Sequence, residues 1–126
     1  MFANFAAIFT TLKPVMAEQA DRLAVQKDTA IEYSLETKGP SPFPQHKGQP
    51  MWFGAVKQGK AYVSFHLMPL YMSATLEKQI SSALKKRMQG KTCFNFTVVD
   101  EALFRELEQL TARGLAAFKR AGFITS

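Results

Sequence analysis

The sequence predicts a two-layer α+β domain in which helices cover one face of an antiparallel sheet of four or five strands. Two runs of strand-forming residues meet at a short polar turn within residues 51–67. Alternating apolar and polar residues recur at 31–37 and 91–99, and apolar residues three and four positions apart mark helices at both ends of the chain. The expected order is helix, three strands, helix, strand, helix. The chain has 126 residues, a length that fits a single domain over positions 1–126.

The first helix is expected over residues 2–23, where apolar side chains form one stripe. Proline lacks an amide hydrogen, so Pro14 should kink or restart this helix. Phe2, Phe5 and Phe9 carry more aromatic surface than one short helix usually hides. If the later helices already cover the sheet, these phenylalanines would be exposed and would form the interface of a homodimer.

The central sheet is expected to hold a first strand over 31–37 and a hairpin over 51–67, which turns at 57–60 with Gly59 at positive φ. Residues 38–50 contain four prolines and two glycines, a composition that sustains neither a helix nor a strand. A loop this long is either a plain surface excursion or a flap over a binding surface.

The remaining elements alternate between helix and strand. A helix is expected over 73–88, and the serine pair at 81–82 could divide it. A strand should follow over 91–99. Asp100 is a suitable N-cap for a last helix over 101–121, because its carboxylate can accept from the unpaired amides of the first turn.

Two strings carry a resemblance to a known family: GQPMWFGAVKQGKAYVSFHLMPLY, and LKKRMQGKTCFNF followed by an Asp-capped helix. They resemble the YdhG-like family of small bacterial domains of unknown function, over nearly the whole chain. The resemblance implies a two-layer α+β fold with an outline similar to type III secretion chaperones, including a fifth strand. That strand would lie around 67–72 or continue past 98–99. The family implies no activity, substrate or catalytic residue.

Composition limits the classes of function. Cys93 is the only cysteine, so no internal disulfide can form, and a reducing, cytoplasmic location is expected. No apolar run reaches the roughly 18 residues that span a bilayer, and residues 1–10 lack signal-peptide features. Two distant histidines offer no metal-ligand spacing, and no cofactor motif is present. We therefore expect no membrane segment, metal or cofactor.

The leading functional hypothesis is a non-enzymatic module that binds a small molecule or a peptide on the sheet face or beneath the 38–50 loop. Polar-tipped aromatic side chains and a histidine on or near the sheet could surround one concavity. The alternative for the aromatic residues is that they are core or interface residues. The candidate ligand-binding residues are Tyr33, Trp52, Tyr62 and His66.

Two other hypotheses use different residues. Cys93 would act as an enzyme nucleophile if His66 reached it across the sheet as a base, although a lone strand cysteine is more often a small buried hydrophobe. A basic cluster would bind an anion or nucleic acid weakly, with affinity that falls steeply as salt rises. Against this, cations are favoured in the last turn of a helix, and no specific nucleic-acid motif is present. The cluster consists of Lys85, Lys86, Arg87 and Lys91.

Overall fold

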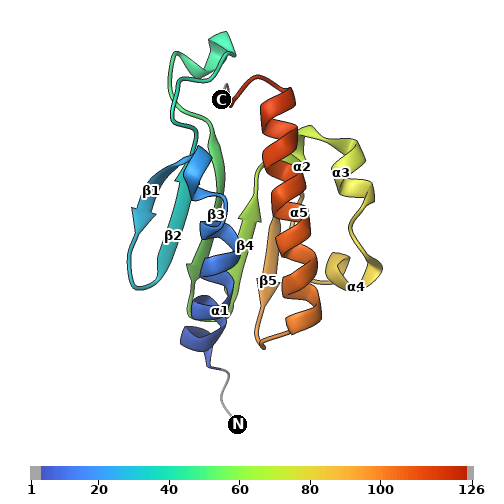
Figure 1. Ribbon diagram of the computed structural model, residues 1–126. Coiled ribbons are helices and arrows are strands. Elements are labelled where there is room, and N and C mark those ends of the chain that lie inside the picture. Colours follow the sequence, from blue (N-terminus) through green and yellow to red (C-terminus); the bar gives the residue numbers. More distant parts are fainter. Residues whose placement is uncertain (1–3, 125–126) are drawn as a thin grey trace.

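The computed structural model describes residues 4–124 and confirms the predicted α+β class (Figure 1). Within these residues one antiparallel sheet has five strands in the order β1-β2-β3-β4-β5, so each strand pairs with its neighbour in sequence. The strands are β1 (Ala24–Asp28), β2 (Glu32–Glu36), β3 (Trp52–Gln58), β4 (Val63–Leu67) and β5 (Cys93–Phe96).

The fifth strand is β1, at the N-terminal edge of the sheet, and neither predicted position for it is correct. Residues 69–72 form the short helix α2 (Pro69–Met72) instead, and β5 ends at Phe96. The strand expected to be first, at 31–37, is therefore β2. At the opposite edge the outer side of β5 is partly paired, because the amide of Gln89 donates to the carbonyl of Cys93 and that of Asn95 donates to the carbonyl of Arg87.

Two long helices, α1 (Phe5–Ala17) and α5 (Glu101–Arg120), lie side by side over one face of the sheet (Figure 1). Between β4 and β5 the chain forms α2, α3 (Ala74–Lys78) and α4 (Ser82–Lys85) in place of one helix over 73–88. The predicted break at the serine pair is confirmed. Ser81 caps α4 by accepting a hydrogen bond from the amide of Leu84 at 3.1 Å.

Helix α1 passes through Pro14 without a break and ends one turn later, at Ala17, followed by the 3-10 turn Ala20–Arg22. Of the two predicted alternatives the restart at Pro14 is therefore wrong, and the kink stays a prediction. Phe9 is buried in the core, and Phe5 is partly buried and packs against it. Phe2 lies outside the described residues. The dimer hypothesis thus loses the exposed surface that it assigned to Phe9, and the oligomeric state itself stays a prediction.

The hairpin predicted over 51–67 is confirmed, but its turn differs from the expected one. β3 continues to Gln58, and the connection is closed by a 2.9 Å hydrogen bond from the amide of Gly59 to the carbonyl of Tyr62. Gly59 does not have the predicted positive φ. The hairpin requires a glycine within β3 rather than at the turn: at Gly54 a Cβ atom would lie 2.5 Å from the backbone oxygen of His66.

Helix α5 begins as predicted, because the Asp100 carboxylate accepts a 3.1 Å hydrogen bond from the amide of Leu103. Its inward face is buried along its length. Gly114 lets the helix approach α2 closely, since an added Cβ would lie 3.1 Å from Cγ of Pro69. The helix ends before Gly122, whose φ of +90° suits a residue without a side chain.

The 38–50 loop lies at one end of the molecule, beside the C-terminal residues 122–124, and does not cover the sheet face (Figure 1). The ring of Phe43 contacts Phe123 with centroids 5.1 Å apart, and Phe123 contacts Phe118 of α5 at 4.9 Å. A cavity of about 590 Å³ lies between this loop and residues 122–124. The predicted single concavity, shared by the loop and the sheet aromatics, is therefore wrong.

Among the described residues no helix is both long and apolar enough to cross a membrane.

Candidate functional site

The candidate site lies on the face of the sheet opposite α1 and α5, which we call the open face. Alternation along each strand sends large apolar side chains toward the helices and smaller or polar side chains to the open face. Cross-strand register then aligns Ser34, Ala55, His66 and Cys93 in one row over β2 to β5. Residues that are distant in sequence are thus neighbours on this face.

A β-bulge places Trp52 on the open face. Leu35 pairs with Gly54 and Glu36 pairs with Trp52, so Phe53 is the extra residue in β3. Phe53 is fully buried on the helical side, and from this residue on the side chains of β3 alternate in the opposite phase. Without this bulge, period-two alternation would point Trp52 into the core.

Trp52 joins a chain of polar contacts across the open face. Its indole Nε1 donates to the Ser34 hydroxyl at 3.0 Å, and that hydroxyl donates to Gln26 Oε1 at 2.7 Å. On its other side the indole lies against the imidazole of His66, with ring centroids 5.5 Å apart. These contacts explain how Ser34 is buried on a face that no helix covers.

The structure brings His66 and Cys93 together. Cys93 Sγ lies 3.7 Å from His66 Nε2, and the thiol also donates to Asn95 Oδ1 at 3.2 Å. The two side chains are on the same face and the thiol is half-buried, as a working pair would require. Their proximity follows from the strand register, since His66 of β4 lies directly opposite Cys93 of β5.

The environment keeps this pair neutral. Burial raises the pKa of the Cys93 thiol above its usual value. Burial also lowers the pKa of His66, with a further decrease from the Lys57 charge and an opposing increase from Glu32. At neutral pH the two groups are therefore a thiol and a neutral imidazole, which differs from the thiolate and imidazolium of a strongly activated cysteine.

Next to this pair the open face is hollowed at its hairpin end. The hollow has a volume of about 420 Å³, and we call it the hairpin hollow. Two lysines, a tyrosine, a serine and a histidine supply its polar groups, and none of the described residues that line it is a carboxylate. The lining residues are Lys57, Gly59, Lys60, Ala61, Tyr62, Ser64 and His66.

The predicted ligand-binding residues are thus only partly brought together. Tyr62 and His66 line the hairpin hollow. Trp52 does not line it, but its ring lies against the ring of His66. Tyr33 lies on the helical side instead, where it is buried in the core and Lys13 Nζ is 5.4 Å from its ring centre. Its pKa is raised, mainly by burial. The prediction that Tyr33 and Trp52 belong to one site is therefore wrong.

The basic cluster does not line the hairpin hollow. Lys85 and Lys86 are exposed at the end of α4, a helix of only four residues, so the dipole that was expected to favour them is weak. Lys91 Nζ lies 5.7 Å from the centre of the Tyr71 ring, which gives this cation a local partner. Binding of an anion by the cluster remains a prediction.

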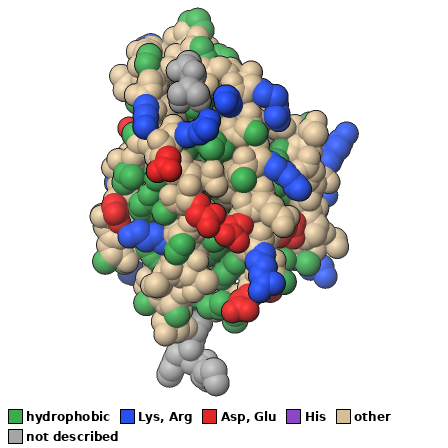
Figure 2. Space-filling view, in the orientation of Figure 1, with side chains coloured by type: hydrophobic (Ala, Val, Ile, Leu, Met, Phe, Trp, Pro, Cys, Tyr) green, Lys and Arg blue, Asp and Glu red, His purple; other side chains and the backbone are tan. Residues whose placement is uncertain are grey.

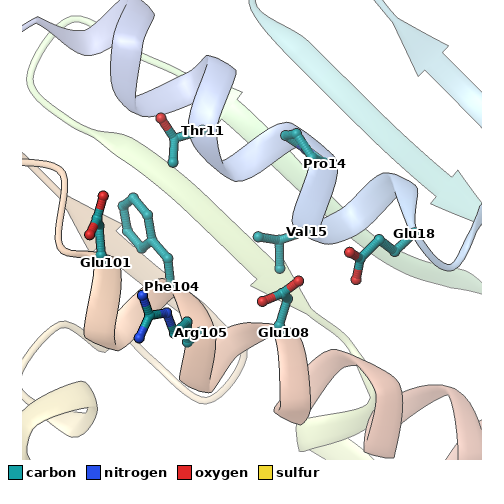
Figure 3. Close-up of a pocket in the computed structure, with 8 residues that line it drawn as sticks. All are labelled: Thr11, Pro14, Val15, Glu18, Glu101, Phe104, Arg105 and Glu108. Atoms are coloured by element: carbon teal, nitrogen blue, oxygen red, sulfur yellow. The ribbon is translucent and has the colours of Figure 1, made fainter.

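A third pocket, which the sequence did not indicate, lies between α1 and α5 (Figure 3). Its volume is about 280 Å³, and Figure 3 shows Phe104 and Val15 between the two helices. Partial desolvation and a hydrogen bond to Glu108 raise the pKa of Glu18. The helical face shows acidic side chains across its middle (Figure 2). This pocket is smaller than the hairpin hollow and three of its lining residues are carboxylates (Glu18, Glu101 and Glu108), so it is a weaker candidate for an anionic ligand.

Within residues 4–124 no group of three or more His, Cys, Asp or Glu side chains could hold a metal ion. Comparison of the chain with protein-family models, curated proteins and solved structures gives no match. The YdhG-like resemblance remains a prediction.

Proposed function

We propose that this protein is a non-enzymatic binding module that holds a small anionic molecule in the hairpin hollow. The observation that carries the proposal is the chemistry of the lining, where Lys57 and Lys60 meet Tyr62 and Ser64 and no carboxylate intervenes. A recessed site with cations of one sign concentrates anions, because its low-dielectric walls focus the field.

Each lining group has a distinct part in binding. The two lysines supply charge, although Glu32 lies opposite Lys57 on the neighbouring strand and reduces its effect. Tyr62 is 43% exposed and offers a ring face for a planar ligand. Neutral His66 can donate one hydrogen bond and accept another, which fixes the orientation of a polar ligand.

The size of the hollow favours a small molecule over a peptide. Ligand sites commonly measure about 300–1,000 Å³, and 420 Å³ lies near the lower limit. Such a volume suits a single ring with one anionic substituent.

Binding should be measured by ligand-observed NMR with benzoate, phenyl phosphate and the neutral analogue benzamide. We expect the two anions to bind and benzamide to bind much more weakly. Replacing both lysines (Lys57→Gln with Lys60→Gln) should weaken anion binding about tenfold, which corresponds to about 1.4 kcal/mol. Tyr62→Ala should weaken binding of the ring in all three ligands.

Tyr71→Ala is the matched control, because Tyr71 is an exposed tyrosine beside a lysine but lies outside the hollow. It should leave every affinity unchanged. Equal binding of benzamide and benzoate, or equal loss in the Tyr71→Ala protein, would remove the proposal.

We also propose a cytoplasmic location, membership of the YdhG-like family of bacterial domains, and a homodimer. The single cysteine and the two quoted strings support the first two. The dimer has weaker support, because among the described residues of the predicted interface Phe9 belongs to the core and Phe5 is partly buried. A sedimentation mass of one chain at high concentration would exclude the dimer.

A further inference from the structure

We propose that Cys93 is a site of reversible covalent attachment, at which its thiol exchanges with a small anionic disulfide seated in the hairpin hollow and His66 accepts the proton. This inference rests on the proposed function, because the hollow must first hold the anionic part of the molecule. Three features of the open face lead to it.

The first feature is the position of the thiol relative to the hollow. His66 belongs to both, since it lines the hollow and its Nε2 lies 3.7 Å from Cys93 Sγ. Ser64, in the hollow, is diagonal to Cys93 across the β4–β5 pair, and such neighbours are about 7–8 Å apart. Cys93 itself does not line the hollow, so the bound disulfide must extend past His66 to bring one of its sulfurs within reach of the thiol.

The second feature is the neutral state of the pair. A thiol must lose its proton to attack. The structure directs that proton to Asn95 Oδ1, so the thiol turns about its Cβ–Sγ bond to bring the proton to His66 Nε2, the nearest base, 3.7 Å from the sulfur. Because burial disfavours both charged forms, the thiol reacts slowly with disulfides that do not bind nearby. Selectivity then comes from the hollow, which holds the bound disulfide beside the sulfur.

The exchange is balanced without another reactant. Cys93 Sγ attacks one sulfur of the bound disulfide, a new S–S bond forms and the old S–S bond breaks. The thiol proton passes to His66 and then to the departing thiolate, which leaves as a thiol. The protein sulfur is oxidised and the departing sulfur is reduced.

The third feature is the absence of a second cysteine in the chain. No internal thiol can resolve the mixed disulfide, so it persists until an external thiol attacks it. The Asn95 side chain also has its oxygen toward the sulfur, as the acceptor at 3.2 Å. The Asn95 side chain therefore holds the reduced thiol through an acceptor.

Stopped-flow absorbance can test the inference, because the only thiol in the chain is Cys93. The anionic reagent is dithiobisnitrobenzoate, an aromatic disulfide with a carboxylate on each ring, and the neutral reagent is dithiodipyridine. We expect His66→Gln to slow both reactions about tenfold or more, as removal of a general base does. Loss of the Lys57 charge also raises the pKa of His66, and this change acts on both reagents alike. The Lys57→Gln, Lys60→Gln double variant should therefore slow the anionic reagent by about threefold to tenfold relative to the neutral one, and added salt should act in the same direction.

The controls use the few equivalent residues in the chain. His46→Gln changes the only other histidine, which lies in the 38–50 loop, and should leave both rates unchanged. Cys93→Ser should abolish both reactions. Unfolding midpoints of the variants establish that the fold is intact.

Two outcomes would overturn the inference: rates that His66→Gln does not change, or an anionic reagent whose rate does not depend on the two lysines. Failure of the proposed function is recognised separately, by adding nitrobenzoate to the Cys93→Ser protein. If nitrobenzoate binds there while the His66→Gln rates are unchanged, the thiol inference fails and the binding module stands. If nitrobenzoate does not bind, both fail.

Discussion

Replacing Gly54 by alanine is expected to lower the free energy of unfolding by about 3 kcal/mol, at the upper end of the usual cost of overpacking. The added Cβ would lie 2.5 Å from the backbone oxygen of His66 and 2.7 Å from Cε of Met16. The methionine can shift, but the oxygen belongs to a strand paired on both sides. The substitution must therefore displace one of the two strands. Urea unfolding measures the change.

The same substitution should disturb the site, because it pushes on the peptide that carries His66. We expect weaker anion binding and a changed Cys93 reaction rate in the Gly54→Ala protein. Gly39→Ala is the matched control, since a Cβ there would meet nothing within 4 Å. Equal unfolding midpoints for the two variants would show that β3 and β4 tolerate the extra methyl group.

The sequence allows the layers of this fold to be predicted because burial has a period. β2, β3, β4 and β5 each send large apolar side chains to one side, and α5 has a regular buried stripe and an Asp100 cap. β1 has no such signal. Its residues, AVQKD, are mostly exposed, as suits an edge strand. Backbone pairing with β2, and not a buried face, makes this segment a strand.

The sites were harder to predict because they depend on register. The proximity of His66 and Cys93 follows from the β4–β5 pairing, and three short helices separate these strands in sequence. Tyr33 lies among the residues that alternation assigns to the buried face of β2, and the structure confirms that assignment. Trp52 escapes the same rule because the bulge at Phe53 reverses its side.

The α1–α5 pocket had no local signal at all. Glu18 directly follows the last residue of α1, whereas Glu108 lies within α5, and neither residue belongs to a motif. Only the packing of α1 against α5 makes them neighbours. Contacts of this kind follow from the three-dimensional arrangement of helices, which a one-dimensional pattern does not contain.

Truncation of Phe118 to alanine should have the largest effect on stability, a loss of about 3–5 kcal/mol in the free energy of unfolding. The side chain is fully buried on α5. Its ring packs edge-on against Phe53 of β3, with centroids 5.2 Å apart, and against Phe123 at 4.9 Å. The substitution thus opens a cavity where the helix, the sheet and the C-terminal residues meet. Chemical denaturation at equilibrium measures the loss.

Phe43→Ala is the control, because Phe43 is at the outer end of the same aromatic series, 5.1 Å from Phe123, and is 36% exposed. It should cost about 1 kcal/mol or less, since the removed ring was partly in water. It should also raise hydrogen exchange in residues 38–50 without changing anion binding, because this loop lies away from the hairpin hollow. A loss of binding in the folded Phe43→Ala protein would mean that the loop contributes to the site after all.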